Sequence, residues 1–399
     1  MNLEVREPRE SELDQHAALH DEGYGLPAGT GRARADDDRA AGLVERMLGA
    51  YDGERLVGRL IVLPFGQFFG GRPMPMGGIS QVVVAADARG SGVGRALLDA
   101  AFGRMRAHGE VVSALSPATV PIYRNAGWEL AGDQHVYRLP IGDLARCAPT
   151  PRRVRRVEPG DHDAIKRCYV RFAGARNGML ARPAFLWQRR FQPDPAQRRY
   201  VVEHDGGDVT AYISYRCSMR STAPGYRLVV DDFAALDWDS ERALWHHLAG
   251  HRAQTDAVVM MCPPGEALAL HIPEPTIERI HAQRWMLRIV DAAGAIAARG
   301  FPPSLHASVP LTIADPRVHA NEGDWTLEVD GGRGVLHRES SGPPSSVAIT
   351  INALAPLFSA AISARALAAA GLVSGASSGQ LATLDAMFSG PHPAMSDRF

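Results

Sequence analysis

A glycine-rich turn between a valine-rich run and a helix-like segment contains the residues that most directly indicate chemistry. Residues 81–98 read QVVVAADARGSGVGRALL, with a glycine at every second position from Gly90 to Gly94. A turn that leads into the first turn of a helix carries backbone N–H groups without partners, beside the positive end of the helix dipole. Glycine leaves these amides open to an anion and tolerates positive φ, while Arg89 and Arg95 add positive charge. The turn therefore predicts a phosphate-binding site.

Three kinds of phosphate-binding turn are considered for this pattern. A nucleotide P-loop reads G-x-x-x-x-G-K-[ST], and this turn has neither the lysine nor the following Ser or Thr. A dinucleotide fingerprint, G-x-G-x-x-G, belongs to the first βα unit of a domain, whereas this turn reads G-x-G-x-G and follows about 80 residues of other structure. The third, [RQ]-x-x-G-x-[GA], cradles the pyrophosphate of coenzyme A and matches residues 89–94, RGSGVG. The valines before the turn and RALLDAAF after it favour this third interpretation over a purely structural turn.

The composition limits the classes of partner. The 399 residues include 43 basic and 44 acidic side chains, so no global positive field favours nucleic acid or anionic lipid. The charged N-terminus lacks the features of a secretory signal, and no apolar run approaches the ~18 residues that span a bilayer. The four cysteines include no C-x-x-C pair, and His247 and His251 have no carboxylate or cysteine at ligand spacing. We therefore expect a cytoplasmic protein with a small-molecule partner, no nucleic acid, no membrane association and no metal.

The elements that position the glycine turn recur in a second half of the chain. Each half contains a short strand, a loop with proline and acidic residues, a helix, a hairpin with a D-G turn, and a further helix. The matching segments, about 149 to 153 residues apart, are Val5–Leu19 with Val154–Tyr169, Tyr51–Val62 with Glu203–Ser214, and Ser91–Ala100 with Ser240–Ala249. The last pair keeps the helix and loses the glycines, so the second half has the scaffold without the phosphate-binding turn.

A third region begins where two prolines follow the strand-like segment Arg284–Asp291. Trp325–Glu339 predicts two strands around a glycine-rich turn, and Ser346–Val373 predicts a strand and one or two helices. Arg365 and the many alanines argue against a membrane span there. The chain therefore divides into three predicted α/β domains, at residues 1–147, 148–290 and 291–399.

A second motif lies about 30 residues after the glycine turn. The segment SALSPATVPIYRNAGWEL contains Tyr123, Gly127 and Trp128 in a Y-x-x-x-G-[FWY] pattern. Together with the glycine turn and its flanks, this pattern resembles the GNAT N-acetyltransferase superfamily. The glycine-less second half, a C-terminal third similar to sterol carrier proteins, and the final LDAMFSGPHPAMSDRF extend the resemblance along the chain to the Eis (enhanced intracellular survival) family. The resemblance implies an α/β (α+β) fold of tandem GNAT-like domains, the second lacking the acetyl-CoA loop, then a sterol-carrier-protein-like domain, and a homohexamer.

By this resemblance the chain is an acetyl-CoA-dependent N-acetyltransferase in which two groups transfer protons. Tyr123, whose phenol has a reference pKa near ~10, is the general acid that protonates the departing thiolate. The C-terminal α-carboxylate of Phe399 is the general base, and burial of the aromatic ring would give this weak base an apolar setting. The implied acetyl-CoA-binding set, in which the valines of the strand and the last two residues act through their backbone, is Val82, Val83, Val84, Arg89, Gly90, Ser91, Gly92, Val93, Gly94, Arg95, Ala118 and Thr119.

The acceptor is less well defined than the reaction. The resemblance places Ser80 on the substrate side, and Ser116 where Eis proteins carry a histidine; their N-terminal tryptophan is also missing. Asp21, Glu22 and the run Asp36–Asp38 could present charge to an amine, although an acidic run is commonly a solvated helix start. We expect a small multi-amine acceptor such as an aminoglycoside. A protein lysine or a polyamine is the alternative acceptor, and a non-catalytic lipid-binding protein is the alternative from another class.

Overall fold

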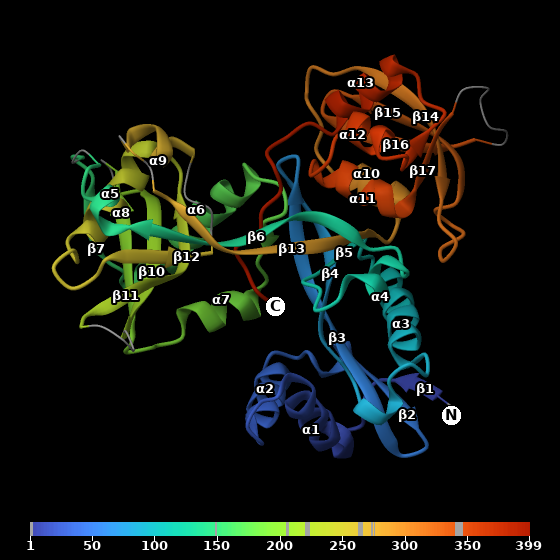
Figure 1. Ribbon diagram of the computed structural model, residues 1–399, viewed down its shortest axis with the longest axis horizontal. Coiled ribbons are helices and arrows are strands. Elements are labelled where there is room, and N and C mark those ends of the chain that lie inside the picture. Colours follow the sequence, from blue (N-terminus) through green and yellow to red (C-terminus); the bar gives the residue numbers. More distant parts are fainter. Residues whose placement is uncertain are drawn as a thin grey trace.

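The chain folds into three units that pack around a shared centre (Figure 1). The computed structural model describes residues 3–147, 150–204, 207–219, 224–261, 266–272, 274, 276–339 and 346–399. The first unit consists, in chain order, of β1 (Leu3–Arg6), α1 (Leu13–Tyr24), α2 (Thr30–Ala40), β2 (Met47–Asp52), β3 (Arg55–Phe69), β4 (Arg72–Val84), α3 (Val93–Ala107), β5 (Val112–Leu115), α4 (Val120–Arg124), β6 (Glu129–Pro140) and α5 (Ile141–Leu144).

The second unit repeats much of this order. Its elements are β7 (Arg153–Arg156), α6 (His162–Gly174), β8 (Leu180–Ala181), α7 (Ala184–Phe191), β9 (Gln197–Glu203), β10 (Val209–Met219), β11 (Tyr226–Ala235), α8 (Trp238–Ala249), β12 (Ala257–Met260), α9 (Glu266–His271) and β13 (Glu278–Ile289). The third unit consists of α10 (Ala292–Ala298), β14 (Ala307–Ala314), β15 (Gly323–Asp330), β16 (Arg333–Arg338), β17 (Val347–Thr350), α11 (Ile351–Ser359), α12 (Ala364–Ala369), β18 (Val373–Ser374) and α13 (Ser378–Met387).

The internal repeat is visible in a shared ion pair at the start of each half. In the first half, both terminal nitrogens of Arg6 in β1 donate to the carboxylate of Glu12 at 2.7 Å, just before α1. In the second half, Arg155 in β7 donates to Asp161 at 2.6 and 2.7 Å, just before α6. Each carboxylate also accepts a backbone N–H three residues earlier, so it closes the turn from strand to helix.

The described residues of the two halves share one sheet of 13 strands. β13, the last strand of the second half, lies between β5 and β6 of the first half, and β6 also pairs with β12. β6 and β13 are 12 residues each and run side by side from one half into the other (Figure 1). The strand exchange places the junction of the halves inside a hydrogen-bonded sheet, and it fixes their relative position.

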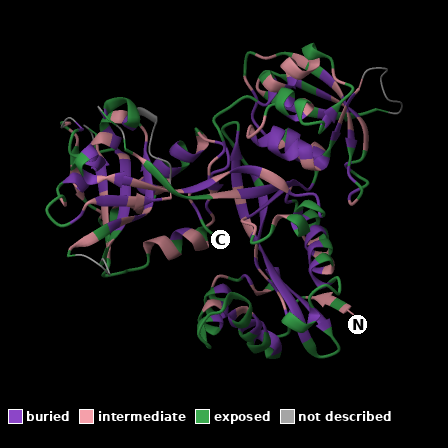
Figure 2. Cartoon of the chain, in the orientation of Figure 1, coloured by how far each residue is buried: buried purple, intermediate pink, exposed green. Residues whose placement is uncertain are grey.

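The third unit is built on a five-stranded sheet and packs onto the first half. The strand order is β16-β15-β14-β17-β18. The buried helix α11 contacts β6 and β13 (Figure 2), and Phe358 in α11 packs edge-on against Phe69 of β3 at 5.2 Å between ring centroids. A buried ion pair, Arg288 Nη2 to Asp315 at 2.7 Å, also crosses this junction. Among the described residues, no helix is long and apolar enough to cross a membrane.

Candidate active site

A fork between two parallel strands forms the floor of the candidate site. β4 and β5 pair over only three positions, the last being Gly78 with Ala114, and then separate. Just beyond this point β4 has a bulge, where Gln81 has a φ of +54° and Val82 has no register partner in β3. A non-glycine residue in this region stores on the order of 1–3 kcal/mol of strain. The bulge releases backbone groups of Val82 from the ladder with β3, so they can bind polar groups of a ligand in the fork.

The buried side chain of Gln81 fixes this bulge. Its Oε1 accepts a hydrogen bond from Arg59, and its Nε2 donates to Asp38 of α2 at 3.1 Å. Arg59 in turn donates to the backbone oxygen of His16 in α1 at 2.8 Å. Hydrogen bonds therefore connect α1 and α2 to the strained part of β4. These contacts stabilise the positive φ of Gln81.

The glycine turn leads into the N-terminus of α3. Gly90 and Gly92 have φ values of +78° and +89°, and Gly92 is the residue that precedes the helix. An added Cβ at either position would meet no atom within 4 Å, so these two glycines are required by conformation and leave the surface open. At Gly94 the reason is packing, because a Cβ there would lie 2.9 Å from Cδ1 of Ile122. The Ser91 hydroxyl donates to Ala88 O at 2.6 Å and holds the turn.

The turn presents a backbone surface suited to a phosphate. The N–H groups of Val93, Gly94 and Arg95, in the first turn of α3, have no partners within the helix and lie at its positive end. Arg89 is exposed beside them, and the Arg95 guanidinium lies 3.8 Å from Asp99. These residues fit an anion such as a pyrophosphate.

The corresponding helix of the second half offers no such surface. At the start of α8 the carboxylate of Asp237 accepts the N–H of Ser240 at 2.8 Å and the Ser240 hydroxyl at 3.1 Å. A negatively charged side chain thus binds the helix start, and it would repel a phosphate. His247 on α8 and His251 in the turn after it both contact the Tyr215 hydroxyl, and the described residues contain no cluster of three metal-binding side chains.

Tyr123 lies on α4, the short helix that follows β5 in the chain. Thr119 precedes this short helix, and together with Ala118 it forms the link from β5 to α4. The Tyr123 ring is buried, with its edge toward Trp128 at 6.4 Å between ring centroids. Burial raises the pKa of Tyr123 to about 12, and the nearby Tyr24 phenol adds to the shift. The phenol therefore stays protonated at neutral pH and can donate a proton.

The C-terminal segment threads between the two halves and ends beside the fork (Figure 1). Its backbone is held on both sides: Ala394 N–H donates to Asn177 O at 3.0 Å, and Met395 N–H donates to Asp133 O at 3.0 Å. The Gln134 side chain on β6 donates to the backbone oxygen of Asp397 at 2.6 Å. The chain end is thus a fixed part of the structure and is not a frayed tail.

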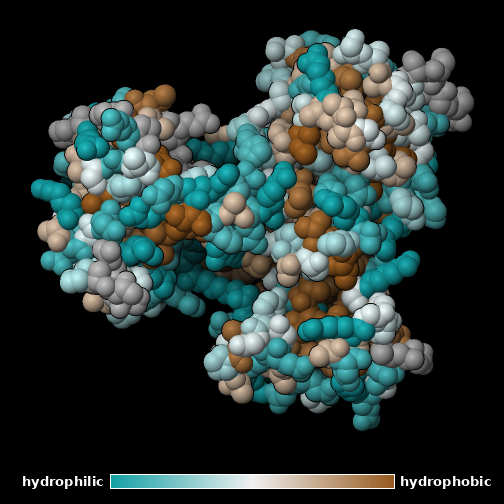
Figure 3. Space-filling view, viewed as in Figure 1, coloured by the Kyte–Doolittle hydropathy of each residue, from teal (hydrophilic) through white to brown (hydrophobic). Residues whose placement is uncertain are grey.

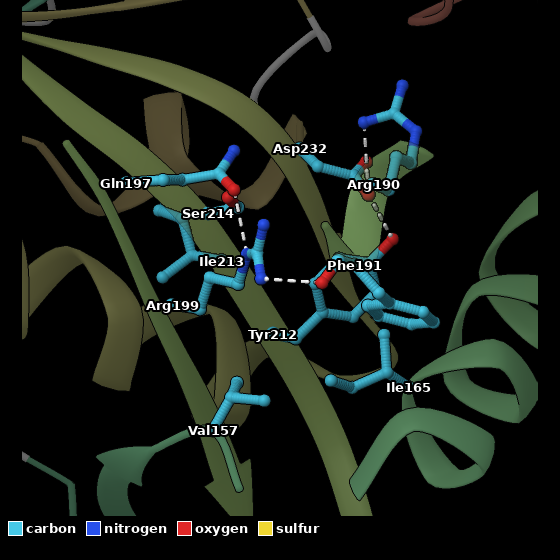
Figure 4. A pocket seen from close by; sticks show the side chains of 10 residues that line it. All are labelled: Val157, Ile165, Arg190, Phe191, Gln197, Arg199, Tyr212, Ile213, Ser214 and Asp232. Atoms are coloured by element: carbon cyan, nitrogen blue, oxygen red, sulfur yellow. Dashed lines mark hydrogen bonds and ion pairs between the residues drawn. The ribbon is translucent and has the colours of Figure 1, made fainter. Parts of the chain in front are cut away.

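A buried charge network anchors this segment. Asp397, 1% exposed, accepts hydrogen bonds from Arg182 Nε at 3.1 Å, from Arg190 and from the Tyr169 hydroxyl at 3.2 Å. Arg182 also forms a paired contact with Asp232, with both distances at 2.8 Å. Figure 4 shows Arg190 beside Asp232 at a small cavity of the second half. The network of four charged side chains holds the last residues to the second half.

The terminal residue Phe399 lies where two cavities meet. Its ring packs against Phe65 of β3 at 4.9 Å between centroids, and Gly78 leaves room for both rings, because a Cβ there would lie 2.7 Å from Phe65 Cδ2 and 3.0 Å from Phe399 Cε2. The surface is hollowed between the second unit and the α1–α2 pair (Figure 3). The two cavities, of about 400 and 470 Å³, are together called the acceptor cavity and are lined by His20, Tyr24, Thr30, Arg34, Leu63, Phe65, Ser80, Gln81, Ser116, Gln134, Val136, Phe185, Leu186, Arg189, His281, Gln283, Arg398 and Phe399.

The structure brings some of the predicted acceptor-side residues together and separates others. Ser80 and Ser116 line the acceptor cavity, the latter donating to Gln134 Oε1 at 3.2 Å. Asp21 and Glu22 do not line it. The carboxylate of Asp21 instead accepts the backbone N–H groups of Gly29 and Gly31 at 2.9 and 2.6 Å, so it fixes the link between α1 and α2.

No carboxylate of the acidic run of α2 lines the acceptor cavity. Asp36 and Asp37 are on its solvent side, and Asp38 is fully buried. Asp38 lies 3.0 Å from Arg189 Nη2 and 3.4 Å from Arg34 Nε. The negative charge of Asp38 is therefore paired with arginine side chains of the protein.

Several residues that line the acceptor cavity were not predicted from the sequence. His20 and Tyr24 lie one turn apart on α1 and pack at 4.9 Å between centroids, and this spacing was a signal available in the sequence. Phe185 and Arg189 are also one turn apart, on α7 of the second half. Their approach to the first half follows from the strand exchange, which no local pattern reveals.

Three segments of the chain match models of known protein domains. Residues 4–131 and 178–289 each match a model of an acetyltransferase (GNAT) domain, and residues 292–396 match a model of a sterol carrier protein domain. The architecture of two tandem GNAT domains followed by a sterol-carrier-like domain, expected from the sequence, is thereby confirmed.

Similar proteins cover most or all of the chain. The crystal structure of a GCN5-related N-acetyltransferase from Kribbella flavida is 32% identical, has a TM-score of 0.88, and matches 100% of this chain and 98% of that one. An uncharacterized N-acetyltransferase of Streptomyces coelicolor is 28% identical over 327 residues, 78% of each chain. N-acetyltransferase Eis of Mycobacterium tuberculosis is 26% identical over 341 residues, 80% of this chain and 79% of that protein.

Proposed function

The chain belongs to the GCN5-related N-acetyltransferases and is Eis-like, and on this basis we propose that it transfers the acetyl group of acetyl-CoA to a primary amine of a small molecule. The observation that carries the proposal is the open glycine turn at the start of α3, and it is supported by the buried Tyr123 on the next helix and by Phe399, whose ring lies beside Gly78 at the fork of β4 and β5. The second half, whose equivalent helix start binds Asp237, takes no part in binding the donor.

The donor site follows from the backbone of the first half. Bound acetyl-CoA supplies an acetyl thioester. The amides at the start of α3, with Arg89 beside them, bind its pyrophosphate. The released backbone groups at Val82 hydrogen-bond the pantetheine arm in the fork, with the link at Ala118 and Thr119 on the opposite side.

Tyr123 acts as the general acid. Its phenol, kept protonated by burial, donates its proton to the thiolate sulfur as the carbon–sulfur bond breaks, and the phenolate then regains a proton from solvent. Because the pKa of Tyr123 is about 12, the phenolate recovers this proton rapidly at neutral pH.

The α-carboxylate of Phe399 acts as the general base. It accepts the proton that the amine loses as the new carbon–nitrogen bond forms, directly or through a water molecule. Packing of the ring against Phe65 holds the carboxylate at the meeting point of the two cavities. The homohexamer implied by the family resemblance remains a proposal, which analytical ultracentrifugation tests.

The donor site is tested by Gly92→Asp, which places at α3 the kind of carboxylate that occupies α8. Both the positive φ of Gly92 and the added charge oppose binding, so we expect the Kd for acetyl-CoA to rise at least ~10-fold in calorimetry. Gly103→Asp is the matched control, because it adds the same charge on the exposed side of α3. Equal effects of the two variants would refute the assignment of the turn.

The acid and the base are tested by separate variants. Tyr123→Phe removes one hydroxyl and should lower kcat ~100-fold or more with unchanged acetyl-CoA binding. Gly78→Ala directs a methyl group against the rings of Phe65 and Phe399 and should lower kcat ~10-fold, whereas Gly142→Ala on α5, with no described atom within 4 Å of the new Cβ, should not. Full activity of Tyr123→Phe would remove this residue from the mechanism.

A further inference from the structure

The charged side chains that line the acceptor cavity are cationic. Among the described lining residues, Arg34, Arg189 and Arg398 are the side chains with a permanent charge, and none is an aspartate or a glutamate. Among the described lining groups, the anion is the α-carboxylate of Phe399, which is the base in the proposed mechanism. A cavity shaped for a polycation would be expected to carry acidic side chains.

Arg398 is the cation most available to a ligand. It lines both cavities, its side chain is exposed, and no hydrogen bond or ion pair joins it to another described residue. A guanidinium carries five N–H donors in a planar arrangement that matches a carboxylate or phosphate. Arg398 therefore faces the acceptor with its donors unused by the protein.

Arg34 and Arg189 are only partly neutralised. Both contact the same carboxylate, Asp38, at 3.4 and 3.0 Å, and Asp38 also accepts a hydrogen bond from Gln81. Arg59, 2% exposed, lies behind this group and donates to Gln81. Asp38 thus pairs with two guanidinium groups and is linked to a third through Gln81, so the cavity-lining side chains of α2 and α7 are more cationic than anionic.

The aromatic residues of the cavity add no compensating negative charge. Burial and the positive charge of Arg59 lower the pKa of His20, so His20 is neutral at neutral pH. Tyr24, Phe65 and Phe185 provide aromatic surface beside the arginines. The combination suits a molecule with an apolar or aromatic body and an acidic group.

We propose that the acceptor is an amine that also carries an anionic group, a carboxylate or a phosphate, held by Arg398 with Arg34 and Arg189. The proposal rests on the proposed acetyl transfer and narrows its acceptor class. A polycationic aminoglycoside would bring several positive charges toward these arginines, and is therefore a poor acceptor for this chain.

Matched amines provide the test. Benzylamine and 4-(aminomethyl)benzoate differ by one carboxylate, and ethanolamine and 2-aminoethyl phosphate differ by one phosphate; tobramycin is the polycation. Initial rates with acetyl-CoA give kcat/KM for each, and calorimetry in the presence of coenzyme A gives binding without turnover. We expect kcat/KM and affinity at least ~10-fold higher for the acidic member of one or both pairs, which also identifies the preferred acid.

The variant Arg398→Gln tests whether the cavity causes the preference for the acidic amine. It should reduce the ratio of kcat/KM between paired amines ~10-fold, while Arg365→Gln on the exposed surface of the third unit leaves the ratio unchanged. Because the test uses a ratio, a general loss of activity at the neighbouring Phe399 cancels. A ratio near one in the unmodified protein, preference for tobramycin, or an equal loss for both amines in Arg398→Gln would overturn the proposal. If no amine is acetylated, the proposed acetyl transfer is refuted. The calorimetric affinities then still show whether the cavity prefers the acidic member of each pair.

Discussion

Neutralising Asp397 tests whether the buried charge network positions the chain end. Asp397→Asn keeps the shape of the side chain and removes its negative charge. Arg182 retains its paired contact with Asp232 at 2.8 Å, and Arg190 retains a contact with the same residue at 3.3 Å. One buried carboxylate then remains for two guanidinium groups.

The expected magnitude follows from burial. Removing one partner of a buried ion pair costs about 3–5 kcal/mol, and the lower end applies because Arg190 is partly exposed and the Asn side chain can still hydrogen-bond. A cost of ~3 kcal/mol raises the population with a detached chain end ~100-fold. Since residues 393–399 can separate while the sheet stays paired, this cost applies mainly to the terminal segment.

Hydrogen exchange of two amides measures the detachment directly. Ala394 and Met395 donate to Asn177 and Asp133, and both amides should exchange ~100-fold faster in Asp397→Asn. The control is Asp239→Asn, which removes one partner of an exposed pair with Arg242 and should leave these amides unchanged. Unchanged exchange at both amides in Asp397→Asn would refute the anchoring role. Faster exchange with full kcat would instead refute the need for a fixed chain end.

Three further predictions concern acid–base behaviour and stability. Because the pKa of Tyr123 is about 12, the wild-type rate should show no loss of the general acid up to about pH 10, whereas a fall near pH 8 would contradict the shift. The hydrogen bond from Arg6 lowers the pKa of Glu12 from 4.5 to about 2, so its stabilising contribution is complete above about pH 4.5 and is lost as the pH falls to about 2. Glu12→Gln should therefore lower the free energy of unfolding by about 2 kcal/mol at pH 7 and by little at pH 2, as denaturant titration can show. Asp315→Asn leaves the guanidinium of Arg288 buried without its charged partner and should cost about 3 kcal/mol in the same assay, so a change below ~1 kcal/mol would contradict the importance of this pair.

The parts of the site that depend on local backbone could be predicted from the sequence. The glycine turn lies at the start of α3 and Tyr123 lies on the next helix, because strand, turn and helix follow one another within the segment that carries the motif. The repeat was also visible, since each half keeps its strand, loop and helix in the same order.

The parts that depend on charge partners and on the strand exchange could not be predicted. Asp21 looked like an acid available to an amine, and only the fold shows its carboxylate turned to the amides of Gly29 and Gly31. The run containing Asp38 looked solvated, yet Arg189 from the other half reaches it because β13 joins the two halves. A cavity whose walls come from α1, α2, α7 and the chain end has no sequence signature of its own.

Mass spectrometry of the products tests the central claim most directly. The protein, with its native C-terminus and no C-terminal tag, is incubated with acetyl-CoA and the panel of primary amines, while free thiol is measured in parallel. We expect acetylated amine equal in amount to the thiol released. Thiol release accompanied only by free acetate, or an unmodified panel despite saturated acetyl-CoA binding, would contradict it.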